Sequence, residues 1–94
     1  MAYETNNAHN FIMCYTWFLL SRKIKPSQLE ELVPLEYDKW KDDLETGFAK
    51  IPQEYRNDYR QYLSRCNCEY KPFMDHFGVE KELLQRIENS VYQH

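Results

Sequence analysis

The chain has 94 residues, of which 43% are hydrophobic and 29% charged, and its formal net charge is −3. This length and composition predict a single globular domain over residues 1–94 and exclude a disordered chain. The slightly acidic balance argues against a general polyanion-binding protein, which would carry a basic excess.

A polar lead-in, in which one asparagine is expected to cap the first helix, precedes the apolar stretch Phe11–Leu20. Ten apolar residues are too few to span a bilayer, and no basic residue precedes them as in a signal peptide. We therefore predict a buried helix over about residues 7–23 and no membrane association. A helix that is apolar all round must be covered on all sides, either by the other helices or in part by a second copy in a homodimer.

The next segments are punctuated by two prolines. Pro26 disfavours helical geometry at Lys25, so the first helix should end before it. Ser27-Gln28-Leu29-Glu30 has the pattern of a capping box, with Ser27 as the cap, and predicts a short helix that ends near Val33. Pro34 suits the first turn of a third helix.

In this third helix, apolar residues spaced 3-4-4 predict one buried face, and Gly47 is the expected helix terminator. The apolar residues are Tyr37, Trp40, Leu44 and Phe48. Acidic residues alternate with lysines on the opposite face, which indicates a solvated surface rather than an acidic site.

Pro52 is expected to open a fourth helix that extends to about Cys66. Its inward stripe would consist of Tyr55, Tyr59, Tyr62, Leu63 and Cys66. Arg56 and Arg60 lie one turn apart on a neighbouring face. Tyrosine and arginine are enriched in the hot spots of protein interfaces, so Tyr55, Arg56, Tyr59, Arg60 and Tyr62 are the candidate partner-binding residues. The alternative is that the tyrosines belong to the core and the arginines to a solvated face.

The C-terminal part is predicted to contain a short helix over 73–77, a break at Gly78, and a last helix to about Tyr92. Val79, Leu83, Leu84, Ile87 and Val91 form the apolar side of the last helix. The stretch from Phe73 to Ile87 resembles a helix-turn-helix unit of transcriptional regulators, with Gly78 at the turn. This resemblance implies that the second helix enters the major groove. The DNA contacts would then be Lys81, Gln85, Arg86 and Asn89, with Lys71 on a phosphate.

No catalytic constellation can be named from the sequence, and we predict neither an enzyme nor a cofactor. Cys66 and Cys68 form a C-x-C pair that lacks the second ligand pair of a zinc site, so no metal is predicted. With Cys14 they make three cysteines, and an odd number without a secretion signal indicates reduced thiols in the cytoplasm.

The sequence thus predicts an all-α bundle of five or six short helices around a central apolar helix. Two glycines and four prolines leave little material for β-turns, and no segment alternates as a strand would. For function we expect a noncatalytic interaction module, an adaptor, inhibitor or regulatory protein that binds another protein. Its size also fits an inhibitor encoded by a phage or mobile element. The alternative is a small DNA-binding regulator that uses residues 73–91.

Overall fold

The computed structural model describes the backbone of residues 7–64 and 70–92. Within these ranges it contains six α-helices and no β-strand, which confirms the predicted all-α bundle. The helices in chain order are α1 (Asn7–Ser21), α2 (Pro26–Trp40), α3 (Leu44–Lys50), α4 (Gln53–Ser64), α5 (Lys71–Phe77) and α6 (Lys81–Tyr92).

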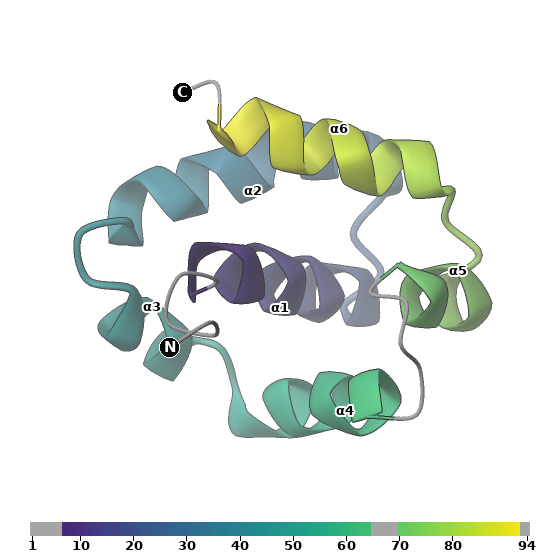
Figure 1. The fold of residues 1–94 in the computed structure, drawn as a ribbon, viewed down its shortest axis with the longest axis horizontal. Helices are drawn as coiled ribbons and strands as arrows, with labels where there is room; N and C mark the ends of the chain where they lie inside the picture. The colour runs from purple at the N-terminus through teal and green to yellow at the C-terminus, as the bar shows by residue number, and fades with distance from the viewer. Residues whose placement is uncertain (1–6, 65–69, 93–94) are drawn as a thin grey trace.

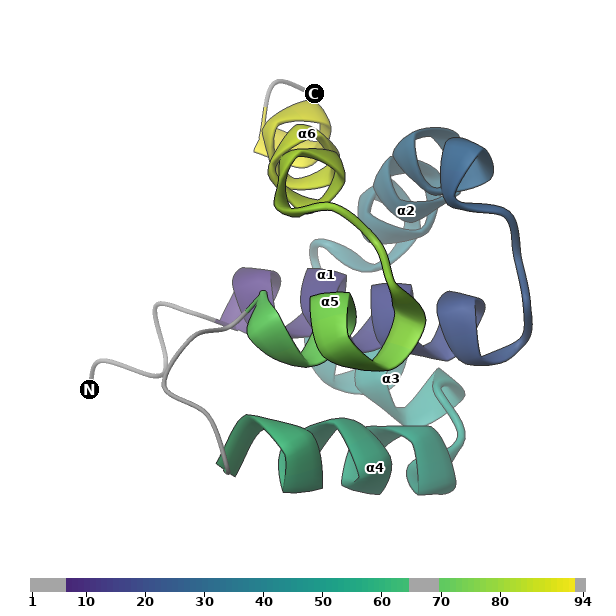
Figure 2. The same ribbon diagram turned by 90° about the vertical axis from the view of Figure 1, so that its right-hand side faces the viewer.

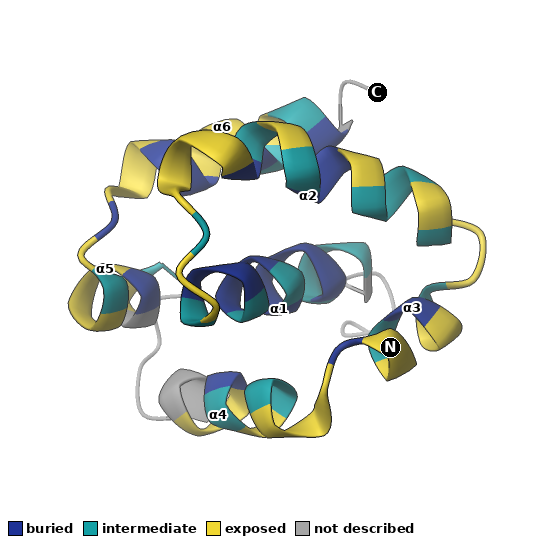
Figure 3. Cartoon of the chain, turned by 180° about the vertical axis from the view of Figure 1, so that it is seen from behind, coloured by how far each residue is buried: buried dark blue, intermediate teal, exposed yellow. Residues whose placement is uncertain are grey.

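Helix α1 runs through the middle of the bundle, with α2 and α6 on one side and α4 on the opposite side (Figures 1 and 2). Between Phe11 and Leu20, only Tyr15 and Phe18 are half-buried, and the other residues are buried (Figure 3). Helices of the same chain therefore cover α1, as a helix that is apolar all round requires. This confirms the predicted central helix, and the homodimer stays a prediction.

Helix α1 ends in a Schellman motif. The backbone N–H of Lys23 donates to the carbonyl of Leu20, and the N–H of Ile24 donates to the carbonyl of Leu19, both at 3.0 Å. This hydrogen-bond pattern holds Lys23 in the left-handed region with a φ of 64°. The chain therefore reverses at a residue other than glycine, although glycine is the usual residue in this position.

The predicted helix boundary at Pro34 is wrong, because α2 is one helix that contains Pro34 in its interior. The predicted capping box is also wrong. Lys25 is the N-cap without a side-chain cap hydrogen bond, and Ser27 lies inside the first turn behind Pro26. An interior proline costs a helix about 3 kcal/mol. Pro34 is buried with Val33, and the packing of this face against the core offsets that cost.

The predicted role of Gly47 as a helix terminator is wrong as well. Helix α2 already ends at Trp40, and Asp43 caps α3 by accepting hydrogen bonds from the backbone N–H (3.3 Å) and the hydroxyl (2.6 Å) of Thr46. Gly47 is buried inside α3, where a Cβ would lie 2.7 Å from Cβ of Trp40 and 3.0 Å from Cε2 of Phe11. The predicted apolar stripe still packs against the core through Tyr37, Trp40, Leu44 and Phe48.

The C-terminal helices agree with the sequence prediction in the described ranges. Helix α4 follows Pro52, and α5 ends at Gly78, which has a φ of 70°. The residues predicted for the apolar side of the last helix are buried, namely Leu83, Leu84, Ile87 and Val91 in α6 and Val79, which lies just before α6. Cys66, the expected end of the fourth helix, lies outside the described residues.

An aromatic cluster around the fully buried Trp17 joins α1 to α4 and α5. The ring centroid of Trp17 lies 5.5 Å from that of Tyr59, 5.1 Å from that of Phe73 and 4.7 Å from that of Phe77. The contacts with the two phenylalanines are edge-to-face, an arrangement that stabilises aromatic pairs beyond their buried area. Trp17 thus fixes the position of α4, which carries the candidate site.

Candidate functional site

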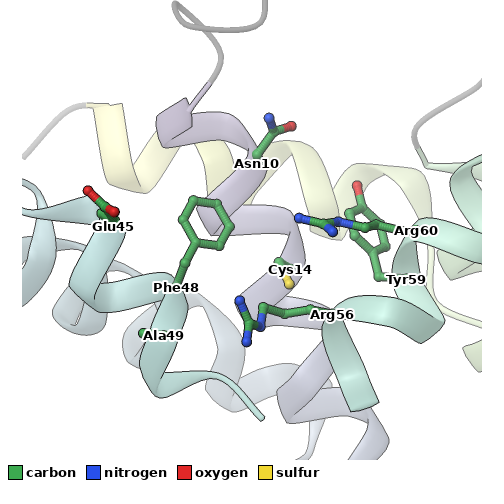
Figure 4. Close-up of a pocket in the computed structure, with 8 residues that line it drawn as sticks. All are labelled: Asn10, Cys14, Glu45, Phe48, Ala49, Arg56, Tyr59 and Arg60. Atoms are coloured by element: carbon green, nitrogen blue, oxygen red, sulfur yellow. The ribbon is translucent and has the colours of Figure 1, made fainter. Parts of the chain in front are cut away.

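A cleft of about 530 Å³ opens between α1, α3 and α4. Eight residues line it: Asn10 and Cys14 from α1, Glu45, Phe48 and Ala49 from α3, and Arg56, Tyr59 and Arg60 from α4 (Figure 4). This volume lies within the range of ordinary ligand pockets. It is the place where the predicted Tyr/Arg face of the fourth helix meets side chains from two other helices.

The helical period of α4 determines which of its side chains reach the cleft. Tyr55 and Tyr59 are one turn apart and turn toward α1, where Tyr55 meets Phe18 edge-to-face at 5.0 Å. Arg56 and Arg60 follow each tyrosine by one residue and therefore lie on the neighbouring strip of the helix. The anchored tyrosines hold these two arginines at the edge of the cleft.

The two arginines have no partner in the described part of the chain. Neither guanidinium forms a hydrogen bond or ion pair with another described residue, and the Nε of Arg56 is buried without an acceptor. In Figure 4, both side chains extend from α4 toward Cys14. A buried donor without an acceptor is destabilising by about 1–3 kcal/mol, and none of the described residues accepts from the Nε of Arg56.

Cys14 lies at the inner side of the cleft, where the charges of Arg56 and Arg60 affect the pKa of its thiol. Burial raises the pKa of its thiol to about 11, and the positive charges of Arg56 and Arg60 partly counteract this increase. The thiol is consequently neutral at physiological pH, whereas a nucleophilic cysteine needs a thiolate. Cys14 therefore contributes an uncharged surface to the cleft, within the electrostatic field of both arginines.

The opposite end of the cleft is acidic. Glu45 lies on the far side of Phe48 from the two arginines (Figure 4), in the first turn of α3. Phe48 packs edge-to-face on Phe11 at 5.6 Å and is held in this position. The cleft thus has a cationic end, an apolar middle and an anionic end.

The five predicted partner-binding residues occupy different environments. Arg56 and Arg60 line the cleft, Tyr55 is half-buried against α1, and Tyr59 is buried with 5% of its surface exposed. Tyr59 is thus mainly a core residue whose side chain also forms part of the cleft wall. The side chain of Tyr62 lies outside the described residues.

The predicted DNA-contacting residues lie on the exposed side of α5 and α6. Lys81, Gln85 and Asn89 are exposed, Arg86 donates through its Nε to Glu30 at 2.8 Å, and Lys71 pairs with Asp75 at 3.1 Å. The hydrogen bond to Glu30 raises the pKa of Arg86 above its usual value. Helix α6 packs chiefly against α2, whereas the helices of a helix-turn-helix unit pack against each other.

The sequence alone does not predict that the arginines share a cleft with Asn10, Cys14, Glu45 and Phe48. Asn10 and Cys14 are spaced i, i+4 and share one side of α1. The sequence pattern does not distinguish this side of α1 from the others, because Phe11–Leu20 is apolar on all sides. The position of α3 depended on the helix boundary at Trp40, which the sequence prediction missed.

None of the helices in the described ranges is long and apolar enough to cross a membrane. The same residues contain no group of three or more His, Cys, Asp or Glu side chains arranged to hold a metal ion. Cys66 and Cys68, the C-x-C pair, lie outside them. His76 stacks on Trp17 with ring centroids 5.3 Å apart.

No protein-family model, curated protein or solved structure matches this chain significantly.

Proposed function

We propose that this protein is a noncatalytic interaction module that binds a larger protein over the cleft between α1, α3 and α4. The observation that carries this proposal is that Arg56 and Arg60 both line that cleft without a hydrogen bond or ion pair to any residue within 7–64 or 70–92. Arginine is enriched in interface hot spots, and it contributes most where neighbouring contacts exclude water. The module would act as a small inhibitor, adaptor or regulatory subunit in the cytoplasm.

The surroundings of the arginines support a protein partner. Phe48 and Ala49 provide an apolar wall, and the half-buried Tyr55 lies on the same helix as the arginines. A central apolar patch with charged groups beside it is the usual anatomy of a protein interface. The neutral thiol of Cys14 supports binding rather than covalent chemistry at this site.

The proposal is tested by affinity capture from the lysate of the source organism, followed by binding measurements with the purified captured protein. Arg56→Ala/Arg60→Ala should weaken that binding at least about tenfold, because hot-spot residues each contribute 2 kcal/mol or more. The matched control is Arg22→Ala/Lys25→Ala, which removes the same charge from exposed residues near the end of α1. Equal affinities of the two double variants would refute the proposal.

DNA binding through α6 is the alternative that the same capture distinguishes. Nuclease treatment would remove every captured protein if DNA were the bridge, and Lys81→Ala/Arg86→Ala would abolish recovery. Affinity for DNA would also fall steeply with salt concentration because counterions are released. A protein interface that covers these arginines and excludes water around them should be much less sensitive to salt.

A further inference from the structure

We infer that the cleft is a receptor for one oxyanion group, a carboxylate or phosphate, which Arg56 and Arg60 bind together beside Cys14. The inference rests on the proposed function in so far as the oxyanion belongs to a segment of a partner protein. The binding of the anion itself requires only the cleft and can be measured on the isolated chain.

The first argument is the unsatisfied charge. Two guanidinium groups lie on one cleft without a hydrogen bond or ion pair in the described part of the chain, and one Nε–H is buried. Buried polar groups in folded proteins are normally paired, and those that are not need a particular explanation. An anion in the cleft would accept from both side chains and would supply the missing partner.

The second argument is the geometry of the donors. Arg56 and Arg60 are one helical turn apart and reach toward the same region, with Asn10 on the facing helix (Figure 4). A guanidinium presents parallel N–H donors that match the oxygens of a carboxylate or phosphate. Phe48 and Ala49 give the cleft an apolar side, and a ligand that covers the site would exclude water and strengthen charge-assisted hydrogen bonds.

The third argument concerns the surroundings of the cleft, which favour a single oxyanion over a polyanion. Glu45 occupies the far end of the cleft, and Glu54 and Asp58 line the adjoining surface of α4. A nucleic-acid backbone that followed this surface would meet these carboxylates and be repelled. A protein segment with one acidic or phosphorylated residue avoids this repulsion.

The experiment is a titration of the ¹⁵N-labelled full chain, followed through the Nε–H signals of its arginines. Inorganic phosphate and acetate are added separately against chloride at constant ionic strength. We expect saturable shifts for Arg56 and Arg60, whereas the exposed Arg22 should not respond. Saturation by phosphate alone would assign a phosphorylated residue, saturation by acetate alone a carboxylate, and saturation by both the shared oxyanion chemistry.

Cys14 provides a second, independent measurement. In a Cys66→Ser/Cys68→Ser background, its alkylation rate at alkaline pH should fall severalfold when the anion binds, because the anion neutralises the field of the arginines and covers the cleft. Arg56→Gln/Arg60→Gln should also slow alkylation, and the rate should then no longer depend on the anion. A matched Arg22→Gln/Lys25→Gln variant should behave like the parent.

A folded chain that shows no saturable response to phosphate or acetate would overturn the inference. If capture of a protein partner still depended on the arginines in that case, the proposed function would stand and the oxyanion would be excluded. If the anions bound but partner binding did not depend on the arginines, the proposed function would fail and the anion site would remain.

Discussion

The indole Nε1 of Trp17 donates a hydrogen bond of 3.1 Å to the Oδ2 of Asp58, which lies 41 residues further along the chain. Trp17 is fully buried at the centre of the aromatic cluster, and Asp58 is half-buried on α4 between the two cleft arginines. The bond therefore fixes the rotation of α4 about its axis. That rotation directs Tyr59 inward and Arg56 and Arg60 to the cleft.

Asp58→Ala should lower the free energy of unfolding by about 1–3 kcal/mol, because it removes the acceptor of a buried donor. Asp58→Asn, which retains a side-chain oxygen, should cost less. Urea denaturation followed by tryptophan fluorescence measures both values. Asp42→Ala is the control, since Asp42 is exposed and its loss should change stability little. An Asp58→Ala variant as stable as the parent would contradict a structural role for this bond.

Gly47→Ala should destabilise the protein by up to about 2 kcal/mol. Alanine improves helix propensity by about 1 kcal/mol, but a Cβ at 2.7 Å from Cβ of Trp40 requires helices α2 and α3 to move apart, and overpacking costs about 1–3 kcal/mol. Gly78→Ala tests another mechanism, because nothing lies within 4 Å of its Cβ position and φ is +70°. Its cost of about 1 kcal/mol would come from backbone strain alone. Thermal unfolding compares the two, and a stabilised Gly47→Ala variant would contradict the close packing.

Lys23→Gly should stabilise the protein by about 0.5–1 kcal/mol. Lys23 occupies the left-handed position of the Schellman motif with a φ of 64°, where a Cβ is unfavourable and glycine is not. Lys25→Gly is the comparison, because Lys25 has a φ of −65°. Its replacement therefore relieves no backbone strain and increases the entropy of the unfolded chain. Chemical denaturation should show opposite signs for the two variants, and equal destabilisation would argue against the predicted relief of strain.

Glu88→Gln should destabilise the protein at neutral pH and weaken its acid dependence. Burial raises the pKa of Glu88, but hydrogen bonds from His9 and Tyr70 lower it more, so the net pKa lies below the ordinary 4.5. Tyr70 donates at 2.8 Å, and Nδ1 of His9 lies 3.4 Å from the same oxygen. This stabilisation is fully present above pH 4.5 and is lost as the pH falls through the folded-state pKa.

Unfolding free energies between pH 3 and pH 7 measure this effect. The parent should lose more stability over the acid range than Glu88→Gln does. Glu31→Gln, which removes an exposed carboxylate from α2, should leave the acid dependence of the parent unchanged. Parallel pH profiles of the parent and Glu88→Gln would show that the contacts of Glu88 with His9 and Tyr70 do not stabilise its ionised form.

The sequence determined the elements whose patterns are strong and local. The apolar stretch Phe11–Leu20 can only be a covered helix in a small protein, and Gly78 between two apolar-faced segments can only end one helix before another. The buried side of α6 followed from its period of 3.6 residues. The periodicity of side chains within one helix does not depend on the rest of the chain, so the sequence alone predicts it.

Tertiary structure decided the helix boundaries at Pro34, Trp40 and Gly47. Local rules favour a break at Pro34, but this residue is buried with its helix face against the core, and the burial outweighs a local cost of about 3 kcal/mol. Gly47 ends no helix because the approach of Trp40 and Phe11 requires a residue without a side chain. These energies come from contacts between segments, which no local pattern encodes.

Which residues line the cleft also depends on the tertiary structure. Arg56 and Arg60 could be selected from the sequence, since their spacing and neighbours fit an interface. Whether a carboxylate of another described helix pairs with them depends on the tertiary structure. Asn10, Cys14 and Glu45 join them only because α1 and α3 pack beside α4. The helical period thus predicts which side chains share a face, whereas the packing of α1, α3 and α4 decides that this face is one wall of a cleft.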